Sequence, residues 1–196
     1  WPDFKGAMDE AHHPQTVAEL EPLHPARERL AFDELLAHQL ALQLARARRK
    51  ALPGRSLDGD GDKVSAVLQN APFQPTGAQS RAFEEIRADM ALPSRMTRML
   101  HGDVGAGKTF VAALAAAKAA ESGTQTAIMA PTEILARQHA KTLAQLLGPA
   151  GLSVAILTGR DKGKGRAEIL EQMRTGTVDV VCGTHALFQD GVEFAD

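Results

Sequence analysis

The sequence predicts an α/β fold in which a parallel sheet carries helices on both of its faces, with a helical segment ahead of it. Two observations predict this fold. The first is that short β-rich runs alternate with helical runs, which is typical of βαβ units and a parallel sheet. The second is a glycine-rich turn that joins the first β-rich run to the first helical one, as in three-layer folds of this class. The β-rich runs cover 97–101, 126–130, 153–157 and 178–182, and the helical runs cover 108–122, 133–147 and 166–175.

The amino-terminal quarter of the chain has a different residue pattern, without alternating β-rich and helical runs. Residues 1–25 contain four prolines and no clear periodicity, so we expect them to be irregular. Residues 26–50 lack glycine and proline, and their large apolar residues predict a long amphipathic helix. The basic residues at 46–50 suit the negative end of such a helix. The apolar residues that recur every four positions are Phe32, Leu36, Leu40 and Leu44.

A change in residue pattern, from helical to Gly/Asp-rich, marks the expected domain boundary. Pro53 and Gly54 should stop the long helix, and the Gly/Asp-rich stretch 55–63 is typical of a solvated linker. We therefore expect an amino-terminal connector at 1–63 and the α/β domain at 64–196.

Composition limits the function classes. With 44% hydrophobic residues, the 196-residue chain can form a packed core. Its 22 Lys+Arg against 24 Asp+Glu give no overall positive field, so any nucleic-acid contact must come from local basic clusters. The single cysteine, Cys182, excludes a disulfide framework and fits a reducing compartment. No apolar run approaches the roughly 20 residues of a membrane span. We expect a cytoplasmic protein, and the ends, Trp1 and Asp196, look cut from a longer chain.

The glycine-rich turn has the form G-x-x-x-x-G-K-[ST], the P-loop signature. Its glycines let successive backbone N–H groups point at phosphate oxygens, and the helix that follows adds its own free N–H groups. We expect Lys108 to place its charge between the β- and γ-phosphates of ATP, and the Thr109 hydroxyl to ligate Mg²⁺. The sequence thus predicts a P-loop NTPase fold. The turn consists of Gly102, Asp103, Val104, Gly105, Ala106, Gly107, Lys108 and Thr109.

Upstream of the P-loop, residues 73–79 have the form F-x-x-T-x-x-Q. Gln79 could read the edge of an adenine, because an amide donates and accepts at once, and Phe73 could cover the ring face. Alternatively, Thr76 is simply the N-cap of a helix at 77–89. The local residues favour neither interpretation.

Three strands of the predicted sheet end in small polar turns. Ligands of open α/β sheets bind at the carboxyl edge of the strands, so these turns could hold a phosphodiester backbone. Each turn taken alone is more often an N-cap, but a row of three threonines makes a phosphate-binding edge more plausible. The candidate residues are Pro131, Thr132, Arg137, Thr158, Gly159, Arg160, Gly183 and Thr184, followed in one loop by Lys162, Lys164 and Arg166.

These segments in combination resemble superfamily 2 helicases of the RecG branch. The resemblance is carried by GDVGAGKT, APTEILARQH, the LTG-plus-basic-loop segment and GTHALFQDGVEF, and RERLAFDELLAHQLAL resembles the RecG connector. Transcription-repair coupling translocases share the GDVG-x-GKT form but lack the RLAFDELL helix. The resemblance implies a RecA-like lobe of an ATP-dependent motor that remodels branched DNA such as stalled forks and Holliday junctions.

The resemblance also implies roles for the residues above. Phe73, Thr76 and Gln79 would lie near adenine, and Thr132, Arg137, Thr158 and Thr184 would lie along the DNA backbone. The family needs an acidic D-E-x-H box, a second RecA-like lobe and an amino-terminal wedge, which we expect in the rest of the polypeptide. Residues 9–12 spell the box far upstream of the P-loop, where no strand leads into it. Two alternatives stay open: an RNA helicase or coupling-type translocase, and a fragment that binds nucleotide or DNA without catalysis.

Overall fold

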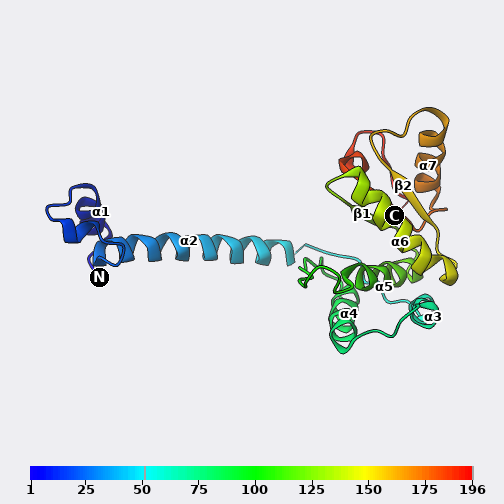
Figure 1. The fold of residues 1–196 in the computed structure, drawn as a ribbon, viewed down its shortest axis with the longest axis horizontal. Coiled ribbons are helices and arrows are strands. Elements are labelled where there is room, and N and C mark those ends of the chain that lie inside the picture. Colours follow the sequence, from blue (N-terminus) through cyan, green and yellow to red (C-terminus); the bar gives the residue numbers. More distant parts are fainter. Residues whose placement is uncertain (51, 196) are drawn as a thin grey trace. The chain divides into compact units, whose positions relative to one another are not determined.

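The computed structural model describes residues 1–50 and 52–195, which form two compact units. The first unit, Trp1–Pro53, contains α1 (Phe4–His12), the short 3₁₀ helix η1 (Val17–Leu20) and α2 (Pro25–Lys50), all coloured blue to cyan in Figure 1. The long helix expected at 26–50 is present. None of the described helices is long and apolar enough to cross a membrane.

The expectation of an irregular stretch at residues 1–25 is wrong. Asp3 caps α1 by accepting a hydrogen bond from the Gly6 N–H at 2.8 Å, and α1 packs on the start of α2 through buried alanines, Ala7 and Ala26. The prolines delimit these helices rather than prevent them, since Pro25 is the first residue of α2, where its missing N–H has no cost. Beyond this contact, the large apolar residues of α2 are exposed within the unit.

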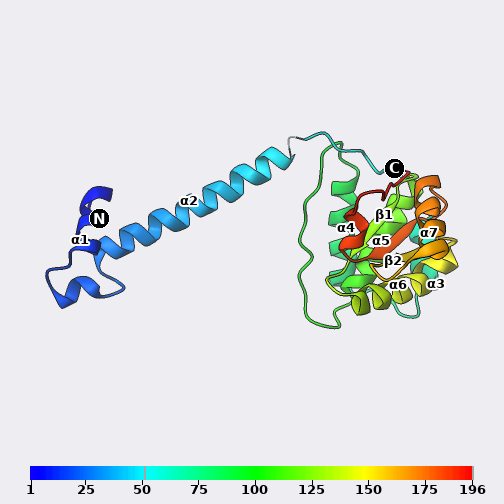
Figure 2. The same ribbon diagram turned by 90° about the horizontal axis from the view of Figure 1, so that it is seen from above.

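The second unit begins at Gly54 and contains a parallel sheet. Within the described residues the sheet has three strands, β1 (Thr126–Met129), β2 (Val154–Leu157) and β3 (Val180–Gly183), in the order β1-β3-β2. β3 is central, with Val180 aligned to Thr126 on one side and to Val154 on the other. The three β-rich runs expected near these positions are therefore confirmed as strands of a parallel sheet (Figure 2).

Helices cover both faces of this sheet. Val180 and Cys182 of β3 belong to the larger apolar cluster, which also contains residues of α5 and α6. Val181 points to the other face, where it packs with Met173 of α7 and Leu187 of η3. Alternation along a single buried strand thus supplies both cores. The helices are α3 (Asp62–Asn70), α4 (Gly77–Met90), α5 (Lys108–Glu121), α6 (Glu133–Leu147), η2 (Gly148–Ala150), α7 (Gly163–Thr175) and η3 (His185–Phe188).

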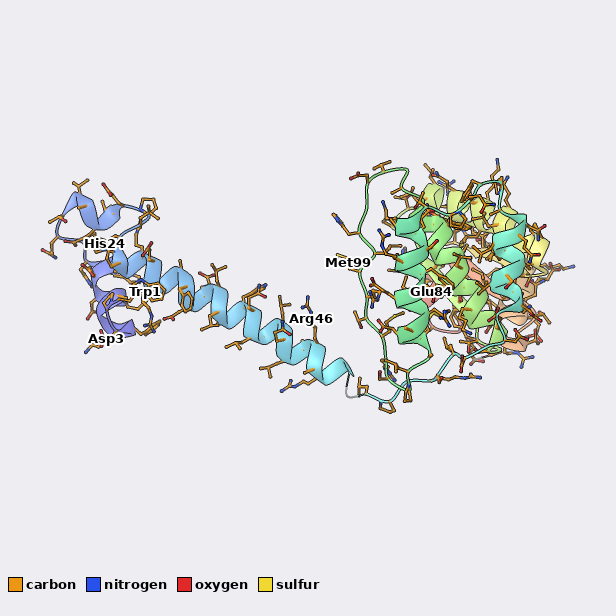
Figure 3. The ribbon with its side chains drawn as sticks, turned by 90° about the horizontal axis from the view of Figure 1, so that it is seen from below. Trp1, Asp3, His24, Arg46, Glu84 and Met99 are labelled. Atoms are coloured by element: carbon orange, nitrogen blue, oxygen red, sulfur yellow. The ribbon has the colours of Figure 1, made fainter. Side chains whose placement is uncertain are left out.

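The strand expected at 97–101 is not formed. This segment has no regular structure and runs as an extended loop beside α4, with Met99 87% exposed (Figure 3). Arg98 holds it there, because its guanidinium pairs with Asp89 at 2.6 Å and with Glu85 at 2.6 Å. A strand is stable only with a hydrogen-bonded neighbour, and in the described part of the chain the ladder β1-β3-β2 does not include this segment.

The two units divide at Pro53/Gly54 rather than at the expected boundary, 63/64. Backbone hydrogen bonds tie the stretch 54–57 to the end of α4, from Gly54 N to Pro93 O at 3.0 Å and from Leu57 N to Met90 O at 2.9 Å. The Gly/Asp-rich stretch therefore belongs to the α/β unit, although Asp58 and Asp60 are exposed as a solvated loop requires.

A buried ion pair fixes the rest of that stretch. Lys118 of α5 donates to the carbonyl oxygen of Gly59 at 2.8 Å, and its ammonium lies 3.6 Å from the Glu121 carboxylate. Glu121 in turn accepts from the N–H groups of Gly61 and Val64, at 3.1 and 2.9 Å. The side chains of Lys118 and Glu121 are only 4% and 1% exposed. This pair anchors the entry to α3, a helix that the sequence did not predict.

Candidate nucleotide site and strand-end edge

The P-loop residues form a tight turn that ends at the start of α5. Gly105 and Gly107 have φ angles of +85° and +76°, a region that residues with a Cβ rarely adopt. Gly107 is the N-cap of α5 and offers no side chain to cap it. The first N–H groups of the helix therefore depend on other acceptors, as a phosphate-binding turn requires. Val104 lies fully exposed at the tip of the loop.

The ammonium of Lys108 folds back over this turn. It donates to the carbonyl oxygens of Gly102 at 2.6 Å and Asp103 at 2.7 Å. The two carbonyls thus hold a positive charge directly over the glycine-rich backbone, next to the uncapped end of α5. Thr109 follows on the first turn of the helix and is half-buried.

Gln79 connects the upstream segment to the P-loop. Thr76 and Gln79 form a complete capping box on α4, in which the Thr76 hydroxyl accepts from Gln79 N and Gln79 Oε1 accepts from Thr76 N. The remaining end of the same amide, Nε2, donates to the carbonyl oxygen of Ala106 at 3.0 Å. The N-cap interpretation of this segment is therefore correct, and the adenine interpretation stays a prediction.

Phe73 packs on the P-loop helix. Its ring meets that of Phe110 edge-on, with centroids 4.9 Å apart, and Phe110 is buried on α5. Phe73 itself remains 44% exposed. A second contact thus connects residues 73–79 to the element that carries Lys108.

The strand-end residues meet at one edge of the sheet. The register aligns Met129 and Leu157 with Gly183, so the residues after each strand emerge side by side. A Cβ at Gly183 would collide with the carbonyl oxygen of Leu157, which explains the glycine there. The edge therefore contains the residues expected from the sequence: Pro131, Thr132, Thr158, Gly159, Arg160 and Thr184.

The threonines of this edge differ in how far a ligand can reach them. Thr132 is exposed, and its hydroxyl caps α6 by accepting from Leu135 N at 3.3 Å. Thr158 is 0% exposed, and both its N–H and its hydroxyl donate to the carboxylate of Asp161, at 2.6 and 2.8 Å. Thr184 is also buried. Only Thr132 presents its side chain to solvent.

A carboxylate that sequence reasoning missed lies between the two candidate arginines. Glu133 Oε1 accepts from Arg137 Nε at 3.0 Å and Nη2 at 2.8 Å, and Glu133 Oε2 lies 3.1 Å from Arg160 Nε. The spacing of Glu133 and Arg137, four residues apart on one helix, is the signal that could have revealed the first of these pairs. Asp161, three residues after Thr158, carries a similar local signal.

The family model of DEAD/DEAH box helicases matches residues 76–194 of this sequence, from the capping box of α4 to beyond η3. The chain belongs to the DEAD/DEAH box helicase family. Within it, the resemblance to RecG is confirmed. The chain is 47% identical over 197 residues to the ATP-dependent DNA helicase RecG of Pasteurella multocida (strain Pm70), and 46% identical over 194 residues to that of Bacillus subtilis (strain 168).

These alignments cover 98% of the present chain but only 28% of either relative's length. The helicase fold is also matched by a solved structure, that of RecG bound to a three-way DNA junction. The TM-score is 0.81 at 42% identity, over 97% of this chain and 26% of the solved one. The mixed α/β fold with a parallel sheet is therefore shared with RecG.

Proposed function

We propose that this chain is the nucleotide-binding part of an ATP-dependent DNA helicase that acts on branched DNA in repair and recombination. The observation that carries the proposal is the P-loop, with Lys108 held over an uncapped helix end, in a chain that is similar to RecG over nearly all of its length. Its α/β unit is the first RecA-like lobe. The wedge and the second lobe would belong to the rest of a cytoplasmic polypeptide.

The turn fits a nucleoside triphosphate with Mg²⁺. Its left-handed glycines would allow the backbone N–H groups to turn toward a phosphate, and Lys108 would exchange the carbonyls of Gly102 and Asp103 for the β- and γ-phosphates. Thr109 would hold Mg²⁺ through its hydroxyl, and a bound metal would neutralise charge on the phosphates. Phe73 and Gln79 would contact the base, since both already touch the P-loop or its helix.

Titration calorimetry with Mg·ATP and Mg·ADP tests the nucleotide part of this proposal. We expect weak binding to the wild-type chain and none to Lys108→Ala. Equal binding by both chains would remove the P-loop assignment. Thermal unfolding of the two proteins serves as the folding control, because the ammonium of Lys108 donates to exposed carbonyls.

We further propose that the strand-end edge holds the sugar-phosphate backbone of DNA. Arg137 and Arg160 would supply the charge there, together with the exposed Lys162, which is the N-cap of α7, and with the exposed Lys164 and the half-buried Arg166 in the first turn of that helix. Such contacts do not depend on base sequence, and the affinity that they provide decreases as the salt concentration rises. Binding in the non-specific range of about 10⁻⁴–10⁻⁶ M is expected. Thr132 would contribute a hydroxyl directly, whereas Thr158 would act through the backbone turn that Asp161 stabilises.

Replacing Lys162, Lys164 and Arg166 together by Ala should flatten the salt dependence of DNA binding, measured by fluorescence anisotropy. The basic end of α2 is a second cluster, so a parallel substitution of Arg46, Arg48, Arg49 and Lys50 provides the control. If the α2 cluster alone accounts for binding, the strand-end path is wrong.

A further inference from the structure

Two arginines, one in α6 and one in the loop after β2, converge on a single carboxylate in the α/β unit. Glu133 is the first residue of α6, Arg137 lies one turn later, and Arg160 lies in the loop after β2. Both oxygens of Glu133 are engaged, Oε1 by Arg137 and Oε2 by Arg160. The side chains of Arg137 and Arg160 are 52% and 85% exposed, whereas that of Glu133 is 22% exposed.

The two ion pairs add little to the stability of the fold. Exposed ion pairs contribute little to folding, because solvent screens them and holding two long side chains costs entropy. Guanidinium N–H groups, however, donate to phosphate oxygens as readily as to carboxylate oxygens. The carboxylate of Glu133 therefore occupies a position where Arg137 and Arg160 would otherwise bind a phosphate oxygen.

We propose that Glu133 is an internal competitor for nucleic-acid phosphate: its carboxylate holds Arg137 and Arg160 in the free chain and is displaced when a phosphodiester group takes its place. This inference rests on the proposed DNA-binding edge and adds a residue that sets its affinity. Displacement leaves the carboxylate at the amino end of α6, where the helix dipole still favours a negative charge. The exchange therefore breaks the two arginine pairs without stranding a buried charge.

A comparison of Glu133→Gln with Glu171→Gln tests the proposal. Glu171 is a matched control, because it also pairs with an exposed arginine, Arg174, with Nε and Nη2 at 2.9 and 2.7 Å, and lies toward the carboxyl end of α7. Both variants remove one negative charge and keep the side-chain shape. Affinity for a fluorescein-labelled single-stranded oligonucleotide is measured with the 196-residue chain by anisotropy at several salt concentrations.

We expect Glu133→Gln to bind DNA about two- to fivefold more tightly than Glu171→Gln, the range that exposed ion pairs span. The slope of log affinity against log salt should stay that of the wild type, because the bound state has the same phosphate contacts in both. Unfolding midpoints should be close to wild type. A gain of affinity at unchanged stability cannot arise from a merely structural role.

The Arg137→Ala/Arg160→Ala double variant separates failure of this inference from failure of the proposed function. If the double variant binds DNA like wild type, the strand-end path is wrong and the inference falls with it. If it binds more weakly but Glu133→Gln does not exceed Glu171→Gln, only the competitor role is refuted. Adding Glu133→Gln to the double variant should give no gain, and a gain there would also refute the role.

Discussion

The side-chain amide of Gln79 donates from Nε2 to the carbonyl oxygen of Ala106 across 3.0 Å, so the start of α4 is joined to the end of the P-loop turn, just before α5. The other end of the same amide closes the capping box with Thr76. A Cβ at Gly107 would displace the end of the Gln79 side chain from this contact, and the φ of +76° already favours glycine there. One side chain thus sets both the beginning of a helix and the shape of the phosphate turn.

We expect Gln79→Ala to weaken Mg·ADP binding about two- to tenfold, the effect of losing one hydrogen bond that shapes the P-loop. It should also lower the free energy of unfolding by about 1 kcal/mol through loss of the capping box. Calorimetry and urea unfolding measure the two effects. Thr76→Ala is the matched control, since it disrupts the cap but not the contact with Ala106. Equal nucleotide affinities for the two variants would contradict the contact's role.

DNA should not stimulate ATP hydrolysis by the 196-residue chain. No D-E-x-[HQ] sequence follows the P-loop within it, so neither the water-activating carboxylate nor the acidic Mg²⁺ ligand of this family is supplied. Without the arginine finger alone, the rate of hydrolysis is lower by a factor of roughly 10³–10⁵. Phosphate release is assayed with and without oligonucleotide. Stimulated hydrolysis that survives repurification and disappears in Lys108→Ala would show the expectation to be wrong.

Lys118→Ala should destabilise the α/β unit by about 3 kcal/mol or more, because it leaves the Glu121 carboxylate buried without its cation. The loop at 58–61 loses its Gly59 anchor and should become sensitive to limited proteolysis. Urea unfolding and peptide mapping measure both effects. Arg174→Ala, which breaks an exposed pair, is the control and should change stability by less than about 1 kcal/mol. Similar losses for the two variants would contradict the anchoring role.

Cys182 should react slowly with thiol reagents in the folded chain. Burial raises the pKa of its thiol to about 11, so at pH 8 only about one thiol in a thousand is ionised. Because the folded-state pKa lies above the ordinary value of 9.0, this group adds no pH dependence below pH 9. Its contribution to stability is lost as pH rises from about 9 through 11. Alkylation rates in buffer and in urea test this, and equal rates would contradict it.

The sequence revealed most of the α/β unit because alternation and glycine punctuation are local signals. The helix at 133–147 has the bounds read from the residues, since Thr132 caps it and Gly148 follows it. The strand at 97–101 could not be judged in the same way, because a strand depends on a neighbour that local pattern does not show. Helix α3 was missed because its anchor, Glu121, lies about sixty residues away in sequence.

The sequence predicted those features of the candidate site that depend on backbone conformation. It did not predict the features that depend on which side chains contact one another. The glycines of the P-loop directly predict its turn. The burial of Thr158 and the carboxylate between Arg137 and Arg160 depend on which residues meet across the sheet edge. Composition does not show these contacts, so the sequence suggested equal exposure for the three threonines, whereas in the structure their exposure differs.

The position of β1 has a consequence for handling the chain in solution. In the described part of the chain, β1 is hydrogen-bonded to β3 alone, and Met129 on it is 60% exposed. A strand with an open edge and an apolar side chain is a template on which another molecule's strand can add. Concentrated samples should therefore self-associate through the open edge of β1. On heating, they should precipitate at a temperature below that at which the core unfolds. A charged residue in place of the exposed Ala127 would be expected to keep such samples monodisperse.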